Sequence, residues 1–179
     1  MDLSNVTAVL ITREKEYPKE IDKSAMAEVF GQVMYRTESP SVYERYRGAA
    51  LAENDIIYVQ DDDCTLDYEY LFKRYDGTLT NAMTEHHFNA YKGSGCTLVG
   101  WGCFFPKSML GVFDKYIERY GEDAHLLREA DRIFTVLNQP HNTHIMEHHD
   151  FTAQTNRMWN EGNHWTSMAE AIEKAKALL

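Results

Sequence analysis

The apolar residues of this chain fall into short runs that alternate with amphipathic stretches. Residues 6–12 are almost all apolar or β-branched, a pattern typical of a central parallel strand buried on both faces. Two further strands are expected at 28–35 and 56–59. The stretches between them, 17–27 and 41–52, have apolar residues at helical spacing. Strands that alternate with helices predict a parallel sheet with right-handed connections.

The second half of the chain continues this alternation. Strands are expected at 79–91 and 96–105, and helices at 66–75, 106–120 and 126–137. A last amphipathic helix follows at the end of the sequence. We therefore expect an α/β fold with a mostly parallel central sheet flanked by helices.

Three local signals predict helix ends. Ser41 is a candidate N-cap, and Glu44 three residues later would complete a capping box. Gly121 is expected to end the helix that begins at Pro106. Thr166 is expected to cap the last helix.

The composition excludes several classes of protein. A length of 179 residues fits one domain spanning 1–179, and 44% hydrophobic with 26% charged residues is ordinary for a globular protein. The net charge of −10 argues against a broad basic face for nucleic acid, although local contact with one is compatible. No apolar run approaches a membrane span, and no signal-peptide pattern opens the sequence. Three cysteines without Cys-x-x-Cys spacing indicate reduced thiols and a cytoplasmic protein.

The acidic triplet Asp61-Asp62-Asp63 directly follows the third expected strand. Three adjacent carboxylates repel one another, and a divalent cation removes that repulsion. Mg²⁺ and Mn²⁺ prefer oxygen ligands, usually one or two carboxylates with phosphates completing the shell. The triplet therefore indicates a metal–diphosphate site at a strand end, with a solvated acidic turn as the alternative.

Two further positions are candidates for ligand contacts. Arg13 follows the first strand, and ligands of open α/β sheets bind beyond the carboxyl ends of strands. Trp101 lies between Gly100 and Gly102, where a close approach by a ligand would let its ring stack on a sugar. The alternatives are a surface arginine and a core tryptophan.

The order of these parts resembles the GT-A class of nucleotide-sugar glycosyltransferases, close to its family-2-like group. The resemblance covers roughly residues 6–165. It rests, in chain order, on Thr12-Arg13, a helix with arginine, Asp61-Asp62-Asp63, Gly100-Trp101-Gly102 followed by Phe104-Phe105-Pro106, Arg128-Glu129-Ala130-Asp131-Arg132, and a late His164. The pattern from Arg157 to His164 is also similar to small glycosyltransferases of phage and actinobacterial genomes.

The resemblance implies a metal-dependent enzyme that moves a sugar from a nucleotide-diphosphate sugar, by default a UDP-sugar, to an acceptor hydroxyl. The cation would be Mn²⁺ or Mg²⁺. The acceptor would be a saccharide or a hydroxylated base in phage DNA, and a phage enzyme would work in the host cytoplasm. The sequence leaves the donor sugar, the acceptor and the oligomeric state open.

The resemblance also implies roles on the donor side. Asp61 and Asp63 match the metal-binding positions, and Asp62 or Asp61 would face the ribose or a metal-bound water. Thr12 and Arg13 match the segment that receives the nucleoside.

Further roles follow in the same way. Arg45, on the helix with arginine, joins the donor-binding residues, and Trp101 matches the wall that lines the sugar and the acceptor. Asp131 matches the general base of inverting members. The family's Glu-Asp pair is replaced here by Ala130-Asp131, so Glu129 is a second candidate for the catalytic carboxylate.

Histidines near the end of the chain are candidates for the last metal ligand. His164 matches a late histidine that can complete the metal shell, and His144, His148 and His149 compete for that role. For each histidine taken singly, a surface or hydrogen-bonded residue is the favoured alternative.

Two other functions are compatible with the same residues. A metal-dependent nucleotidyltransferase would share the sheet and the acidic cluster, but such enzymes commonly carry a glycine-rich loop and a lysine after the first strand. This chain has Thr12-Arg13-Glu14-Lys15 there, without glycine. The other alternative is a sugar- or metal-binding module without turnover.

Overall fold

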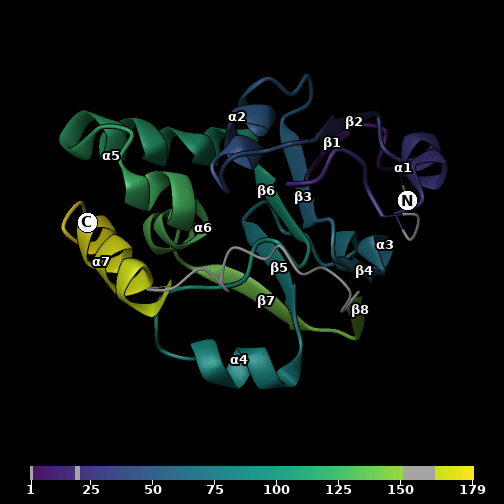
Figure 1. Ribbon diagram of the computed structural model, residues 1–179. Coiled ribbons are helices and arrows are strands. Elements are labelled where there is room, and N and C mark those ends of the chain that lie inside the picture. Colours follow the sequence, from purple (N-terminus) through teal and green to yellow (C-terminus); the bar gives the residue numbers. More distant parts are fainter. Residues whose placement is uncertain (1, 19–20, 151–163) are drawn as a thin grey trace.

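Among the described residues, six strands form the central sheet, in the order β2-β1-β3-β6-β5-β7 (Figure 1). The computed structural model describes residues 2–18, 21–150 and 164–179. The strands of the sheet are β1 (Val6–Ile11), β2 (Gln32–Arg36), β3 (Ile56–Asp61), β5 (Leu79–Met83), β6 (Cys103–Pro106) and β7 (His141–Ile145). β1 is parallel to β2 and β3, and β5 is parallel to β7, whereas β6 is antiparallel to both neighbours. β4 (Cys64–Leu66) and β8 (His148–Asp150) form a separate antiparallel pair.

Helices cover both faces of this sheet. The described helices are α1 (Lys23–Val29), α2 (Glu44–Ala50), α3 (Tyr68–Phe72), α4 (Glu85–Tyr91), the 3₁₀ helix η1 (Lys107–Gly111), α5 (Val112–Tyr120), α6 (Ala124–Leu137) and α7 (His164–Lys176). Helices α2, α5, α6 and α7 contribute to the core on one face, and α1 and α3 to the core on the other (Figure 1). The predicted α/β class, with a mostly parallel sheet flanked by helices, is confirmed.

Alternate side chains of the central strands fill two separate cores. In β1, Val9 packs under α2, whereas Ala8 and Leu10 pack toward α1. In β3, Val59 belongs to the same core as Val9, and Tyr58 belongs to the same core as Ala8 and Leu10. A strand covered on both faces needs apolar residues at every position, which explains the continuous run predicted to be a buried strand.

Residues 79–91 differ from the prediction of one strand. The strand β5 ends at Met83, and α4 begins two residues later. Thr84 is the N-cap, because its hydroxyl oxygen accepts a hydrogen bond from the backbone N–H of His87 at 3.4 Å. An N-cap threonine satisfies a free N–H of the first turn, and this local bond diverts the chain from the sheet.

Residues 96–105 also differ, because only the last part of this segment pairs in the sheet. The chain turns at Gly102, which has a φ of 108° and whose N–H donates to the carbonyl of Val99 at 3.2 Å. The carbonyl of Gly102 accepts from the N–H of Ala82 at 3.0 Å, and β6 starts at Cys103. The glycines therefore form a turn at the sheet edge instead of a strand.

Several predicted boundaries were wrong for local reasons. Residues 28 and 29 belong to α1, whose N-cap is Asp22, and not to the second strand. The predicted capping box is absent: Ser41 precedes the helix by three residues, and Glu44 pairs with Arg36 at 2.8 Å and with Arg47.

Other helix ends were partly predicted. Thr166 lies inside α7 and does not cap it. The stretch after Pro106 starts as η1 before α5 follows. Gly121 ends α5 as predicted, with a φ of 72° and its N–H donating to the carbonyl of Ile117 at 2.8 Å.

Two further observations concern membrane-spanning helices and the state of the cysteines. Across residues 2–18, 21–150 and 164–179, no helix has the length and apolar character that crossing a membrane requires. Cys64, Cys96 and Cys103 are buried, and none forms a disulfide. Burial raises the pKa of the Cys103 thiol well above its ordinary value, so this thiol stays protonated.

Candidate functional site

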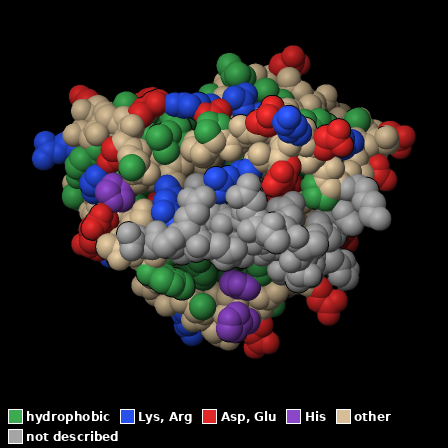
Figure 2. All heavy atoms as spheres, in the orientation of Figure 1, with side chains coloured by type: hydrophobic (Ala, Val, Ile, Leu, Met, Phe, Trp, Pro, Cys, Tyr) green, Lys and Arg blue, Asp and Glu red, His purple; other side chains and the backbone are tan. Residues whose placement is uncertain are grey.

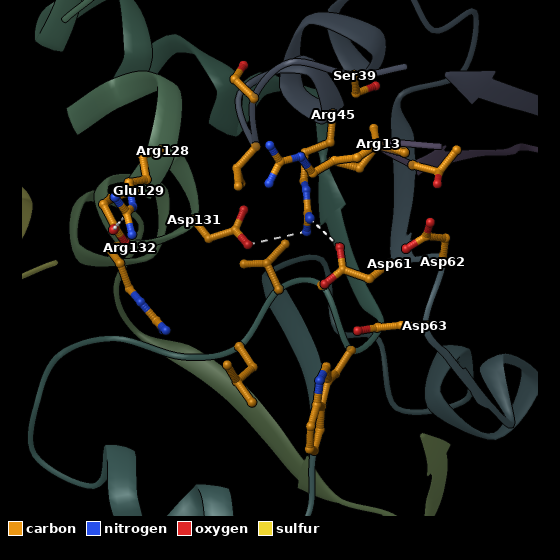
Figure 3. Close-up of a pocket in the computed structure, with 18 of the residues that line it drawn as sticks. Arg13, Ser39, Arg45, Asp61, Asp62, Asp63, Arg128, Glu129, Asp131 and Arg132 are labelled. Atoms are coloured by element: carbon orange, nitrogen blue, oxygen red, sulfur yellow. Dashed lines mark hydrogen bonds and ion pairs between the residues drawn. The ribbon is translucent and has the colours of Figure 1, made fainter. Parts of the chain in front are cut away.

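A cavity of about 200 Å³ opens beyond the carboxyl ends of β1 and β3 (Figure 3). This is the edge at which open α/β sheets bind ligands. The predicted site residues that line it are Thr12, Arg13, Arg45, Asp61, Asp62, Asp63, Trp101, Glu129 and Asp131. Residues separated by more than a hundred positions in the sequence therefore meet in one cavity.

The acidic triplet forms the turn from β3 to β4, and Gln60 braces this turn. The Gln60 amide Nε2 donates to the carbonyl of Cys64 at 2.6 Å, and the Tyr58 hydroxyl donates to Gln60 Oε1 at 2.6 Å. Asp62 and Asp63 are buried, at 8% and 9% exposure. Asp62 and Asp63 are therefore not part of a solvated acidic turn, which was the alternative interpretation, while the Asp61 side chain is partly exposed.

Gly100 provides the space for the Asp61 carboxylate. The N–H of Asp61 donates to the carbonyl of Gly100 at 2.6 Å. A Cβ atom at position 100 would lie 2.0 Å from Asp61 Oδ2, well inside van der Waals contact. The Gly-Trp-Gly turn thus fixes the first aspartate, in addition to placing Trp101 in the cavity wall.

Arg45 connects the two sides of the cavity. Its guanidinium forms ion pairs with Asp61 and, at 3.3 Å, with Asp131 (Figure 3). The Arg45 side chain is 3% exposed. Burial would lower the pKa of Arg45, but the Asp131 and Asp61 carboxylates more than offset this and raise it, so the charge is permanent. Burying an arginine is tolerated because it has two carboxylate partners.

Asp131 is held by two donors. The Tyr46 hydroxyl donates to Asp131 Oδ1 at 2.7 Å, while Arg45 pairs with Oδ2. Burial raises the pKa of Asp131; Arg45 opposes this rise, and the Asp61 charge adds to it. A carboxylate with a raised pKa and a fixed orientation is suited to accept a proton.

Glu129 lies at a break in α6. Its φ of −115° and ψ of 27° are not helical, and its side chain is 3% exposed. The Arg128 Nε lies 3.5 Å from Glu129 Oε1. Backbone irregularity at a cavity-lining carboxylate is typical of functional sites, and it keeps Glu129 as the second candidate for catalysis.

The loop after β1 forms the upper wall of the cavity. Thr12 is buried, its carbonyl accepts from the N–H of Ser39 at 2.9 Å, and its hydroxyl oxygen accepts from the N–H of Glu14 at 3.1 Å. Across the cavity, the Trp101 ring contacts His87 edge to face, with centroids 4.1 Å apart. Trp101 is half-buried in the wall, so the interpretation as a purely core residue is wrong.

Of the four predicted histidine ligands, only His144 has a side chain among the described residues. His164 begins α7, and its side chain lies outside the described residues, as do those of His148 and His149 in β8. His144 lies in β7, where burial lowers its pKa. Among the residues that the structure describes, His144 does not line the cavity.

A divalent cation fits this site only with help from a ligand. Within the described ranges, no three His, Cys, Asp or Glu side chains converge as a ready metal site. Asp61 and Asp63 both extend into the cavity from the same wall (Figure 3). Two carboxylates with substrate phosphates are a usual Mg²⁺ shell, so the donor set fits a cation that arrives with a diphosphate.

The cavity also contains residues to which the sequence analysis assigned no role in the site. They are Ser39, Ser41, Arg128 and Arg132 in the lining, with Tyr46 and Gln60 behind it. Arginine and serine are common surface residues, so the residue type alone does not indicate that these positions belong to a site. Only Tyr46 could have been predicted to lie near the site, because it directly follows Arg45 on a helix that was expected to be half-buried.

Compared with known proteins, the sequence matches no protein-family model, and no curated protein is similar enough to be identified as a relative. The interpretation of the site therefore rests on its own geometry and charge.

Proposed function

We propose that this protein is a metal-dependent glycosyltransferase, which moves a sugar from a nucleotide-diphosphate sugar to an acceptor hydroxyl. One observation carries the proposal. The residues expected to bind the nucleoside, the diphosphate and the acceptor's proton all line one cavity at the carboxyl edge of the sheet. The resemblance to GT-A enzymes gave these residues from the sequence alone.

The charge of the cavity supports a diphosphate bound together with a cation. Among the described residues, four arginines and six carboxylates line the cavity, which gives these residues a formal charge of −2. A diphosphate would be repelled from such a wall unless a divalent cation accompanied it. Asp61 and Asp63 would hold that cation, which when bound stabilises the negative charge of the leaving diphosphate.

In the transfer step, the acceptor oxygen bonds to the anomeric carbon, and the bond from that carbon to the diphosphate oxygen breaks. The nucleoside diphosphate leaves with the electron pair, and the acceptor's proton passes to Asp131. Tyr46 and Arg45 keep the Asp131 carboxylate oriented for this transfer. Asp131 lies on the wall opposite the acidic triplet, which supports attack from the far side of the sugar and hence inversion (Figure 3).

Thermal unfolding with nucleotides and metals tests the proposal. UDP with Mn²⁺, at about 100 times its dissociation constant, should add about 2.7 kcal/mol, a rise in Tm of roughly 5–10 °C. Release of UDP from UDP-sugars should accompany this binding. The Asp63→Ala variant should lose both effects, whereas Asp55→Ala, at the other end of β3, should keep them.

The outcomes separate the alternatives. If no nucleotide raises Tm with any metal, the proposal is wrong. Binding without release of a nucleoside diphosphate would indicate a module without turnover. Release of pyrophosphate from a nucleoside triphosphate would indicate a nucleotidyltransferase.

A further inference from the structure

Arg132 is a buried cation in the cavity wall. It is 8% exposed, and its Nη1 donates to the carbonyl of Thr97 at 3.5 Å. Its Nη2 donates to the hydroxyl of Tyr91, and the guanidinium lies over the Tyr91 ring, 4.6 Å from the centroid. Both partners are neutral. In the part of the chain that the structure describes, no carboxylate forms an ion pair with Arg132.

The other charged residues on this side of the cavity are matched. Arg128 lies beside Glu129 at 3.5 Å, and Asp131 pairs with Arg45 at 3.3 Å. Glu129 and Asp131 are the carboxylates of α6, and they pair with Arg128 and Arg45. Arg132 therefore has no ion-pair partner on this helix. Burial raises the pKa of the Asp131 carboxylate and the Arg132 charge acts to lower it, but Arg132 has no ion-pair contact of its own among the described residues. A buried charge without such a contact is costly, so the position is suited to an anion that enters from outside.

The two ends of the cavity therefore suit ligands of opposite charge. The wall at Asp61–Asp63 needs a cation, while the α6 wall at Arg132 suits an anion, and the two walls lie on opposite sides in Figure 3. Asp131 and Arg132 both line the cavity, and the Arg132 charge is near enough to oppose the rise that burial causes in the pKa of Asp131. A molecule whose hydroxyl reaches Asp131 can therefore place an anionic group near Arg132.

We propose that the α6 wall is an acceptor subsite for a small anionic alcohol, whose phosphate or carboxylate group binds Arg132. The proposal rests on the proposed function, because it takes Asp131 as the base for the acceptor hydroxyl. Arginine suits this role because its planar fork can bind two oxygens of one anion. A cavity of about 200 Å³ admits a small molecule, and the net charge of −10 disfavours a long polyanion. Where described residues form the visible surface, Figure 2 shows basic and acidic side chains mixed.

Three probes of similar size test the subsite: glycerol 3-phosphate, glycerate and glycerol. At about 10 mM, the anionic probe that fits should raise Tm by about 3 °C, the rise expected for a dissociation constant near 1 mM. Glycerol should give no specific rise. The difference between the phosphate and the carboxylate arms identifies the anion.

Variants assign the effect to Arg132. Arg132→Gln should weaken anion binding at least tenfold and keep the response to UDP with Mn²⁺. Tyr91→Phe removes one hydrogen-bond partner of Arg132 and should keep anion binding, as should Arg74→Gln, which changes an arginine outside the cavity. If Arg132→Gln does not fold, Arg132→Lys decides, because it keeps the charge without the planar fork and should weaken binding at least threefold.

The outcomes distinguish this inference from the proposed function. A response to UDP with Mn²⁺, but none to either anion beyond that to glycerol, would overturn the subsite alone. Anion binding that is unchanged in the Arg132 variants would also overturn it. Anion binding without any nucleotide response would support the anion site and contradict the glycosyltransferase.

Discussion

At the scale of single residues, Gly100 has a role that its position between strands does not suggest. Its lack of a side chain leaves room for the Asp61 carboxylate. Gly100→Ala should displace that carboxylate and its ion pair with Arg45, and so weaken Mn²⁺-dependent UDP binding at least tenfold. The loss of stability should be small, about 1–2 kcal/mol, because a short side chain can rotate. Calorimetric titration measures the affinity.

Gly111 offers the matched control for this prediction. A Cβ atom there would meet no other atom within 4 Å, and its backbone is helical. Gly111→Ala should leave UDP binding unchanged and be neutral or slightly stabilising. Equal UDP binding in the Gly100→Ala variant and the wild type would show that Asp61 does not need this space.

The Tyr46 hydroxyl is the second residue-scale feature. Tyr46→Phe keeps the ring, which packs on Phe113 and Phe134, but removes the donor to Asp131. The free energy of unfolding should fall by about 1.5 kcal/mol, the usual contribution of a hydrogen bond to a charged group. Urea denaturation measures it.

Tyr43→Phe is the control for the Tyr46 hydroxyl. Tyr43 also packs against Phe113, and among the described residues its hydroxyl has no hydrogen-bond partner. Its loss should change the free energy of unfolding by less than about 0.5 kcal/mol. Similar values for the two variants would mean that the Tyr46–Asp131 bond contributes nothing to stability.

At the scale of elements, Asp123 joins the start of α6 to α7. Its Oδ1 accepts from the N–H of Leu126 at 2.8 Å as the N-cap, and its Oδ2 pairs with Lys174 of α7 at 2.6 Å. Tyr116 and His125 also face this carboxylate. Asp123→Ala should reduce the free energy of unfolding by about 1–2 kcal/mol at neutral pH.

The effect of this variant should depend on pH. Burial alone would raise the pKa of Asp123, but Lys174 and the Leu126 N–H more than offset it and lower the pKa below 3.8. A lowered pKa stabilises the fold at pH values above 3.8, and this contribution is lost as pH falls below that value. The variant and the wild type should therefore differ less at pH 3 than at pH 7 in urea denaturation. A pH-independent difference would exclude the charge of Asp123 as its cause.

At the scale of the whole molecule, the charge of the cavity determines what it binds. The described lining residues have a formal charge of −2, so the cavity should bind UDP at least tenfold more weakly after EDTA treatment, because the diphosphate then lacks its cation. Uridine, which has no phosphate, should bind equally with and without EDTA. Equal UDP affinity in both conditions would contradict a metal-dependent diphosphate site. Calorimetric titration distinguishes these results.

The sequence alone predicted the parts of the fold that depend on local pattern. The continuous apolar runs of β1 and β3 appear only where a strand is covered on both faces, so their place in the sheet was readable. The triplet at Asp61–Asp63 followed directly, because it begins where the strand ends. The same was true of Gly121, which ends α5 through its own backbone conformation.

Only the tertiary structure decided how distant segments meet. Tyr46 and Asp131 are 85 positions apart, and their bond exists because α2 and α6 pack on the same face of the sheet. The turn at Gly100 and Gly102 depends on contacts with Asp61 and Leu66, which no local pattern records. The burial of Arg132 without an ion-pair partner among the described residues has the same origin. Periodicity reports the surroundings of one element, whereas charge pairing depends on which elements the fold brings together.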